Sequence, residues 1–103
     1  MAVITKSEKE IDQIKEKILP ILKKYSATRA GIFGSYVKGN FSVNSDIDIL
    51  VQLKKKENFS LLDYIGIQQE LEKTLGKKVD LVQYHTLKPY IKDEVLASEV
   101  QIL

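Results

Sequence analysis

Three aspartates stand in sequence surroundings where carboxylates are uncommon. Asp46 and Asp48 open the apolar run 46–53 (DIDILVQL), and Asp80 lies inside the apolar run 78–84 (KVDLVQY). Residues two apart on a strand point to the same face, so Asp46 and Asp48 would lie side by side. Carboxylates on one face repel each other, and a shared cation removes that repulsion. If Asp80 lies on a neighbouring strand, the pattern predicts a site for a divalent cation such as Mg²⁺, which prefers oxygen ligands.

Each aspartate taken alone also has an ordinary structural explanation. Ser45 and Asp46 could form a turn at a solvated strand end, which is the usual origin of an isolated Asp-x-Asp pair. Asp80 could face outward from an edge strand. Both explanations stay open at this point.

Gly34 and Ser35 follow the short apolar segment 28–33. Glycine allows the backbone to approach a phosphate closely, and a helical turn that begins at Ser35 would present amide and hydroxyl donors to an anion. The structural alternative is a turn in which Ser35 is an N-cap. Gly34 and Gly39 have the spacing of a P-loop, but the Lys and Ser or Thr that must follow are missing. P-loop chemistry is therefore excluded.

Two long helices are expected from apolar residues at three- and four-residue steps. The first begins at Ser7, with Glu10 in capping-box spacing, and Pro20 predicts a kink or break in it. Its apolar stripe comprises Ile11, Ile14, Ile18, Ile21, Leu22 and Tyr25. The second is opened by Ser60 with Asp63 and closed by Gly76. Its expected inner face comprises Leu61, Leu62, Ile65, Leu71 and Leu75.

Three strands are expected over residues 28–33, 46–53 and 78–84, and a last helix from Pro89 to about residue 96, with Ile91 and Val95 inward. Alternating helices and strands predict an α/β fold, with a small sheet of about three strands flanked by helices. Residues 1–103 are expected to form a single domain.

Composition narrows the class of protein. The formal net charge is only +2, so direct binding to nucleic acid is not indicated. The chain has no cysteine, which excludes disulfides and cysteine zinc sites. No apolar run approaches the roughly 18 residues of a membrane span, and the N-terminus lacks a signal-peptide pattern. A cytoplasmic protein is the default expectation.

The order of these features resembles a known family. The stretch GSYVKGNFSVNSDIDILV is similar to the signature G-S-x-x-[RK]-G-x5-S-D-x-D of the minimal nucleotidyltransferases, in the superfamily of the DNA polymerase beta palm. The third acid, in KKVDLV, stands at the expected place. This resemblance implies a small mixed sheet flanked by helices, the nucleotidyltransferase fold. Lys38 departs from the arginine of many members, which keeps the charge but loses the planar fork for phosphate.

The resemblance also implies roles for individual residues. Asp46, Asp48 and Asp80 would be catalytic and would hold two Mg²⁺ ions, and Asp80 could also act as general base. The implied nucleotide-binding residues, for ATP as substrate, are Gly34, Ser35, Lys38 and Ser45. Lys38 could equally be an exposed helix residue. Tyr36 and Tyr84 could stack on a base or simply pack at a strand edge.

The function that this resemblance implies is transfer of AMP from ATP to a hydroxyl of a partner protein. The partner would be a HEPN-domain toxin, and the chain its antitoxin. A short chain leaves no room for an acceptor-binding region, so the acceptor surface is expected from another chain. Two alternatives are a non-catalytic antitoxin that masks the HEPN protein and a small-molecule nucleotidyltransferase of the aminoglycoside-modifying kind.

Overall fold

The computed structural model describes residues 5–42, 44–54 and 60–103. Its elements, in chain order, are α1 (Lys6–Lys24), β1 (Ala27–Phe33), α2 (Ser35–Lys38), β2 (Ile47–Leu53), α3 (Leu61–Leu75), β3 (Val79–Gln83), the 3₁₀ turn η1 (Tyr84–Thr86), α4 (Pro89–Ser98) and β4 (Val100–Gln101).

The described strands form one mixed sheet in the order β3-β2-β1-β4. β1 runs antiparallel to β2 and to β4, whereas β2 and β3 are parallel and are joined through α3. The predicted α/β class, a small mixed sheet flanked by helices, is confirmed. The fourth strand was not expected, because two residues are too few to show an alternating pattern.

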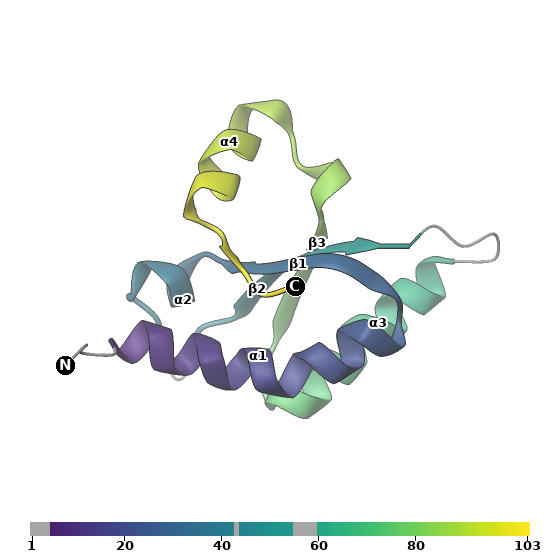
Figure 1. Cartoon of the computed structure of the whole chain (residues 1–103), viewed down its shortest axis with the longest axis horizontal. Coiled ribbons are helices and arrows are strands. Elements are labelled where there is room, and N and C mark those ends of the chain that lie inside the picture. The colour runs from purple at the N-terminus through teal and green to yellow at the C-terminus, as the bar shows by residue number, and fades with distance from the viewer. Residues whose placement is uncertain (1–4, 43, 55–59) are drawn as a thin grey trace.

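The helices divide between the two faces of the sheet. α1 and α3 lie together beneath it, and α4 stands above it (Figure 1). In β2, the residues that join the main core are Ile47, Ile49 and Val51, so this side of the strand faces α1 and α3. Because side chains alternate along a strand, Asp48 and Leu50 must leave the opposite face.

The first helix begins earlier than predicted, and it is not broken at Pro20. It is capped by Thr5, whose hydroxyl accepts a hydrogen bond from the Glu8 amide, so Ser7 already lies inside the helix. The helix continues past Pro20 to Lys24 without a break. Pro20 is exposed while Ile21 and its neighbours along the stripe are buried, and packing of that stripe outweighs the local cost of proline, about 3 kcal/mol.

The third helix ends as predicted, but its inner face is different. Ser60 and Asp63 form the capping box, and Gly76 ends the helix in the left-handed conformation. Leu61 and Leu62 are 73% and 78% exposed, so their prediction as core residues is wrong. Ile65 is also exposed, whereas Leu71 is buried and Leu75 partly buried. The core side follows Tyr64, Ile67 and Leu71 instead, because only that side meets the sheet.

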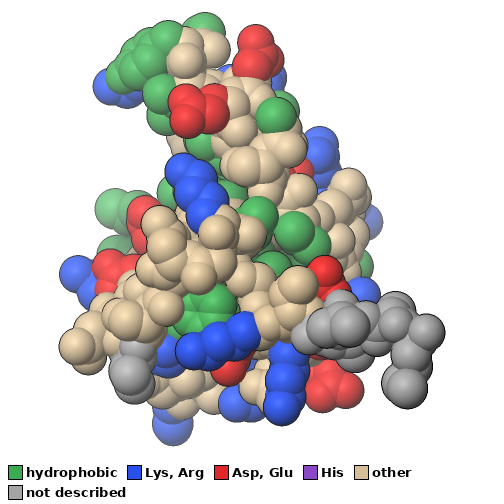
Figure 2. Space-filling model, turned by 90° about the vertical axis from the view of Figure 1, so that its left-hand side faces the viewer, with side chains coloured by type: hydrophobic (Ala, Val, Ile, Leu, Met, Phe, Trp, Pro, Cys, Tyr) green, Lys and Arg blue, Asp and Glu red, His purple; other side chains and the backbone are tan. Residues whose placement is uncertain are grey.

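The last helix is also more exposed than expected. Ile91 is exposed and Val95 only partly buried, so the inward position of Ile91 is wrong. α4 lies apart from the layer of α1 and α3, and hydrophobic side chains gather at the top of the molecule over it (Figures 1 and 2). Across the described ranges, no helix is both long and apolar enough to cross a membrane.

Candidate active site

Asp48 and Asp80 are neighbours across the parallel strands β2 and β3. They are direct partners in the register of the two strands, and each is the second residue of its strand. Partners in a ladder leave the same face of a sheet, with strands about 4.8 Å apart. The tertiary structure therefore brings together two carboxylates that are far apart in sequence, on the face opposite α1 and α3.

Asp46 lies just before β2 and is exposed. The pKa of Asp48 is raised above its ordinary value of 3.8, first because the side chain is partly buried, then by the charges of Asp80 and Asp46. Asp48 thus interacts electrostatically with both other aspartates, and we call the three residues the acidic group. The mutual repulsion is the electrostatic state that a bound cation would relieve.

Gly34 makes a very close approach to this acidic group. It follows β1 with φ +79°, and a Cβ placed on it would lie 2.1 Å from Asp48 Oδ2. Phe33, the preceding residue, pairs with Asp48 across β1 and β2. Only glycine suits both the backbone conformation and the contact. This close packing places Gly34, and with it the N-terminus of α2, against Asp48.

Ser35 is the first residue of α2, not its cap. The N-cap position belongs to Gly34, and no side chain makes a capping hydrogen bond there. The structural alternative in which Ser35 caps a helix is therefore wrong. Its assignment as a phosphate-binding residue stays a prediction, now with its position beside Asp48 in support.

The other two predicted nucleotide-binding residues, Lys38 and Ser45, differ in their exposure and contacts. Lys38 is exposed at the last residue of α2. Ser45 braces the loop that precedes Asp46, because its hydroxyl accepts from the Ser42 amide at 2.8 Å and its own amide donates to the Ser42 carbonyl at 3.1 Å. These two bonds close a turn between Ser42 and Ser45, which ends one residue before Asp46. Nucleotide binding by either residue stays a prediction.

The position of β3, and with it Asp80, depends on side chains of α3 that the sequence analysis missed. The Tyr64 hydroxyl donates to the Leu81 carbonyl, and Gln68 Nε2 donates to the Val79 carbonyl at 2.9 Å. Burial, and secondarily the charge of Asp80, raises the pKa of Tyr64 to about 12. Both donors lie on one side of α3, four residues apart. This i, i+4 spacing is the sequence signal by which the pair could have been identified.

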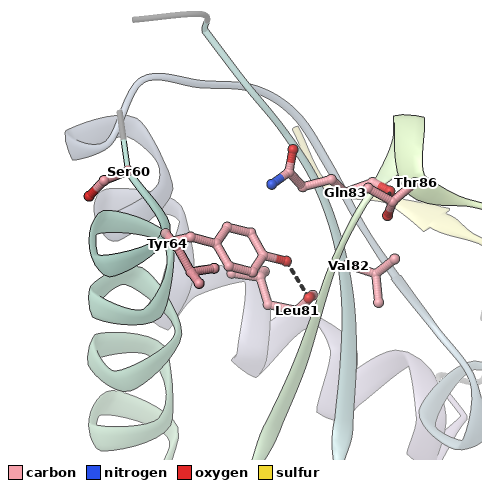
Figure 3. Close-up of a pocket in the computed structure, with 7 residues that line it drawn as sticks. Ser60, Tyr64, Leu81, Val82, Gln83 and Thr86 are labelled. Carbon is pink, nitrogen blue, oxygen red and sulfur yellow. Dashed lines mark hydrogen bonds between the residues drawn. The ribbon is translucent and has the colours of Figure 1, made fainter. Parts of the chain in front are cut away.

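Tyr64 also lines a hollow of about 520 Å³ between the start of α3 and the end of β3 (Figure 3). Its other walls include Leu61, Val82, Gln83 and Thr86. Figure 3 shows Tyr64 reaching from α3 across to the Leu81 carbonyl, so the ring forms the inner wall of the hollow.

A second cluster ties the C-terminal segment to the sheet. Glu99, with a side chain only 4% exposed, lies 3.2 Å from Arg29 and accepts from the Tyr84 hydroxyl. The Arg29 guanidinium lies 4.3 Å from the centre of the Tyr84 ring, and Glu99 fills the space above Gly31. Burial first, then Glu99, raises the pKa of Tyr84. The arrangement supports packing for Tyr84 rather than base stacking.

The carboxylates fit a magnesium site that is completed by substrate. Within the described residues, no three acidic, histidine or cysteine side chains are already arranged as a metal-binding group. Mg²⁺ is commonly coordinated by one or two carboxylates together with substrate phosphates and water, and the adjacent pair Asp48 and Asp80 matches that coordination pattern. The donor chemistry therefore fits the ion, while ligation by all three aspartates stays a prediction.

Replacing Asp48 by asparagine is expected to stabilise the folded protein in the absence of metal. The raised pKa means that ionised Asp48 opposes folding, so the gain is absent below pH 3.8 and develops as the pH rises through the raised pKa. Because the side chain is partly exposed, solvent screening keeps the gain below about 1 kcal/mol, or at most about 4–8 °C in Tm. Thermal unfolding at pH 3.5 and pH 7 measures it, with exposed Asp12→Asn as control.

Proteins of a known family are similar to most of this chain. The profile of the family described as "Polymerase beta, Nucleotidyltransferase" matches residues 16–103. A Methanocaldococcus jannaschii protein classed by name with the protein adenylyltransferases is 46% identical over 93 residues, covering 90% of this chain and 98% of its own length. The protein adenylyltransferase MntA of Thermococcus cleftensis is 40% identical over 80 residues, covering 78% and 79%.

Among solved structures, a toxin-antitoxin crystal structure with AMP-PNP superposes with a TM-score of 0.74 at 26% identity, over 86% of this chain and 72% of the matched chain. That structure contains an ATP analogue. The fold and the sequence thus point to the same group of proteins.

Proposed function

The chain belongs to the polymerase beta nucleotidyltransferase family, and we propose that it transfers AMP from ATP to a hydroxyl group of a HEPN toxin, acting as its antitoxin. The observation that carries the chemistry is the contact of Gly34 with Asp48, in register with Asp80. This contact supports the proposal, because a glycine turn before a helix can bind phosphate and neighbouring carboxylates can bind a metal ion. A protein that acted by masking alone would need neither feature.

The proposed roles follow from this arrangement. Gly34 and Ser35 hold the β- and γ-phosphates, with the Ser35 hydroxyl as a donor. Asp46, Asp48 and Asp80 would hold two Mg²⁺ ions, which would supply Lewis acidity toward the triphosphate and lower the pKa of the attacking hydroxyl. Asp80 accepts the proton of that hydroxyl. The acceptor oxygen forms a bond to the α-phosphorus as the bond to pyrophosphate breaks.

The remaining assignments complete the proposal. Lys38 offsets phosphate charge from the end of α2, and Ser45 supports the loop that carries Asp46. Residues 1–103 act as one nucleotidyltransferase domain. The toxin-antitoxin structure with AMP-PNP and the relatives named as protein adenylyltransferases support ATP as the donor and a protein as the acceptor. The HEPN class of the acceptor rests on the resemblance to the minimal nucleotidyltransferases.

Transfer is tested by incubating the chain with its HEPN partner, ATP and Mg²⁺, and measuring the intact mass of the partner. We expect mass increments of whole AMP units, and none when EDTA removes the metal. A partner whose toxic activity is inhibited with no mass change would favour the masking antitoxin. Increments of equal size in EDTA would contradict the metal-dependent mechanism.

A further inference from the structure

Tyr36, the residue after Ser35, is the anchor of α2. Its side chain is only 1% exposed, and its hydroxyl accepts a hydrogen bond from Lys77 Nζ at 2.5 Å. Its ring stacks on Phe41, with centroids 4.4 Å apart and planes 10° from parallel. A buried tyrosine hydroxyl needs a partner, and a charged donor makes the stronger kind of hydrogen bond.

These contacts join the three segments that carry the candidate catalytic residues. Tyr36 is in α2 with Ser35, and Phe41 is in the loop that leads to Asp46. Lys77 lies two residues before Val79, where β3, the strand that carries Asp80, begins. The Tyr36 side chain therefore contacts residues in or next to all three segments.

Lys77 has a matched counterpart that lacks the hydrogen bond. Lys77 Nζ lies 5.3 Å from the Tyr36 ring centre, and Lys6 Nζ lies 5.3 Å from the Phe41 ring centre. Both lysines line the same hollow of about 420 Å³ at Phe41. Figure 2 faces this end of the molecule, where basic side chains border an apolar patch. Removing one lysine or the other separates the hydrogen bond from the effect of charge.

α2 needs such an anchor because it cannot hold its own position. It has four residues, which is one turn, and no side chain caps its N-terminus. A single helical turn is unstable by itself, so tertiary contacts decide where it lies. A displacement of about 1 Å in a group that contacts substrate can lower a rate on the order of a hundredfold.

We propose that Tyr36 and Lys77 are positioning residues, which hold Ser35 at a fixed position relative to the aspartates through the Lys77–Tyr36 hydrogen bond. This inference rests on the proposed AMP transfer. Neither side chain touches substrate in this proposal. Both act on the reaction by fixing the position of Ser35.

The test uses Tyr36→Phe, which keeps the stacked ring, Lys77→Met, which keeps the apolar stem, their double variant, and Lys6→Met as control. Single-turnover AMP transfer at saturating ATP is measured well below Tm. We expect each single variant to lose on the order of ten- to a hundredfold in rate. The double variant should be no slower than the worse single one, because both changes remove the same bond. Lys6→Met should keep the wild-type rate.

A purely structural role would lower Tm and leave the saturating rate of the folded protein unchanged, and that result would overturn the proposal. An equal loss in Lys6→Met would also overturn it, since charge alone would then be responsible. Hydrogen exchange of the α2 amides is the second measurement and needs no turnover. Faster exchange is expected in Lys77→Met but not in Lys6→Met. Unchanged exchange in Lys77→Met would contradict the anchoring role, whether or not the protein transfers AMP. A wild-type protein that transfers no AMP would refute the proposed function and leave this measurement valid.

Discussion

Replacing Asp46 and Asp48 together by asparagine is expected to lower AMP transfer by at least about a thousandfold while the protein stays folded. A metal that polarises a phosphoryl group contributes several kcal/mol to the transition state, and each 1.36 kcal/mol is tenfold in rate. Asp46 lies just before β2 and Asp48 near its start, both outside the main core, and replacing them removes the charge repulsion among the carboxylates. Transfer from α-labelled ATP to the HEPN partner measures the loss, and circular dichroism checks the fold.

The matched control is Asp12→Asn with Asp93→Asn, which removes the same two negative charges from exposed positions on α1 and α4. This control is expected to transfer AMP at the wild-type rate. Residual transfer within tenfold of wild type in the Asp46 and Asp48 variant would place the catalytic metal elsewhere.

Replacing Ser35 by alanine is expected to slow the chemical step by roughly a hundredfold to a thousandfold. A donor to charge that develops in the transition state contributes on the order of 2.7–4 kcal/mol, so the loss should appear in the single-turnover rate at saturating ATP. Because Gly34 and not Ser35 is the N-cap of α2, the stability lost should fall below the 0.5–2 kcal/mol that is typical of a removed cap.

The single-turnover rate and the Tm of Ser35→Ala are measured side by side. Ser98→Ala is a suitable control, because that hydroxyl bonds only to α4 carbonyls of its own helix, Glu94 and Val95, among the described contacts. A destabilised Ser35→Ala protein with wild-type turnover would show that the hydroxyl serves the fold and that the phosphate assignment is wrong.

Local signals predicted the helices and strands that surround the site. The Ser60–Asp63 capping box and Gly76 marked α3 correctly, because capping depends on residues three or four apart. The α1 stripe was equally clear. Local signals failed for Leu61, Leu62 and Ile91, because periodicity shows that a helix has an apolar side but not how much of that side meets another element.

The amino-acid sequence is enough to identify the residues that could do the chemistry. The spacing of Asp46 and Asp48 predicts that both lie on one face, and Gly34 before Ser35 allows the backbone to approach a phosphate closely. Both expectations follow from backbone geometry over a few residues and need no knowledge of the rest of the fold.

How these residues meet depends on long-range packing. Asp80 stands beside Asp48 because α3 returns the chain to a parallel register, and Tyr64 and Gln68 hold β3 there. The Lys77–Tyr36 hydrogen bond likewise joins residues that no local pattern pairs. Register and side-chain partners of this kind depend on the packing of whole elements, since a shift of one residue would turn Asp80 to the other face of the sheet.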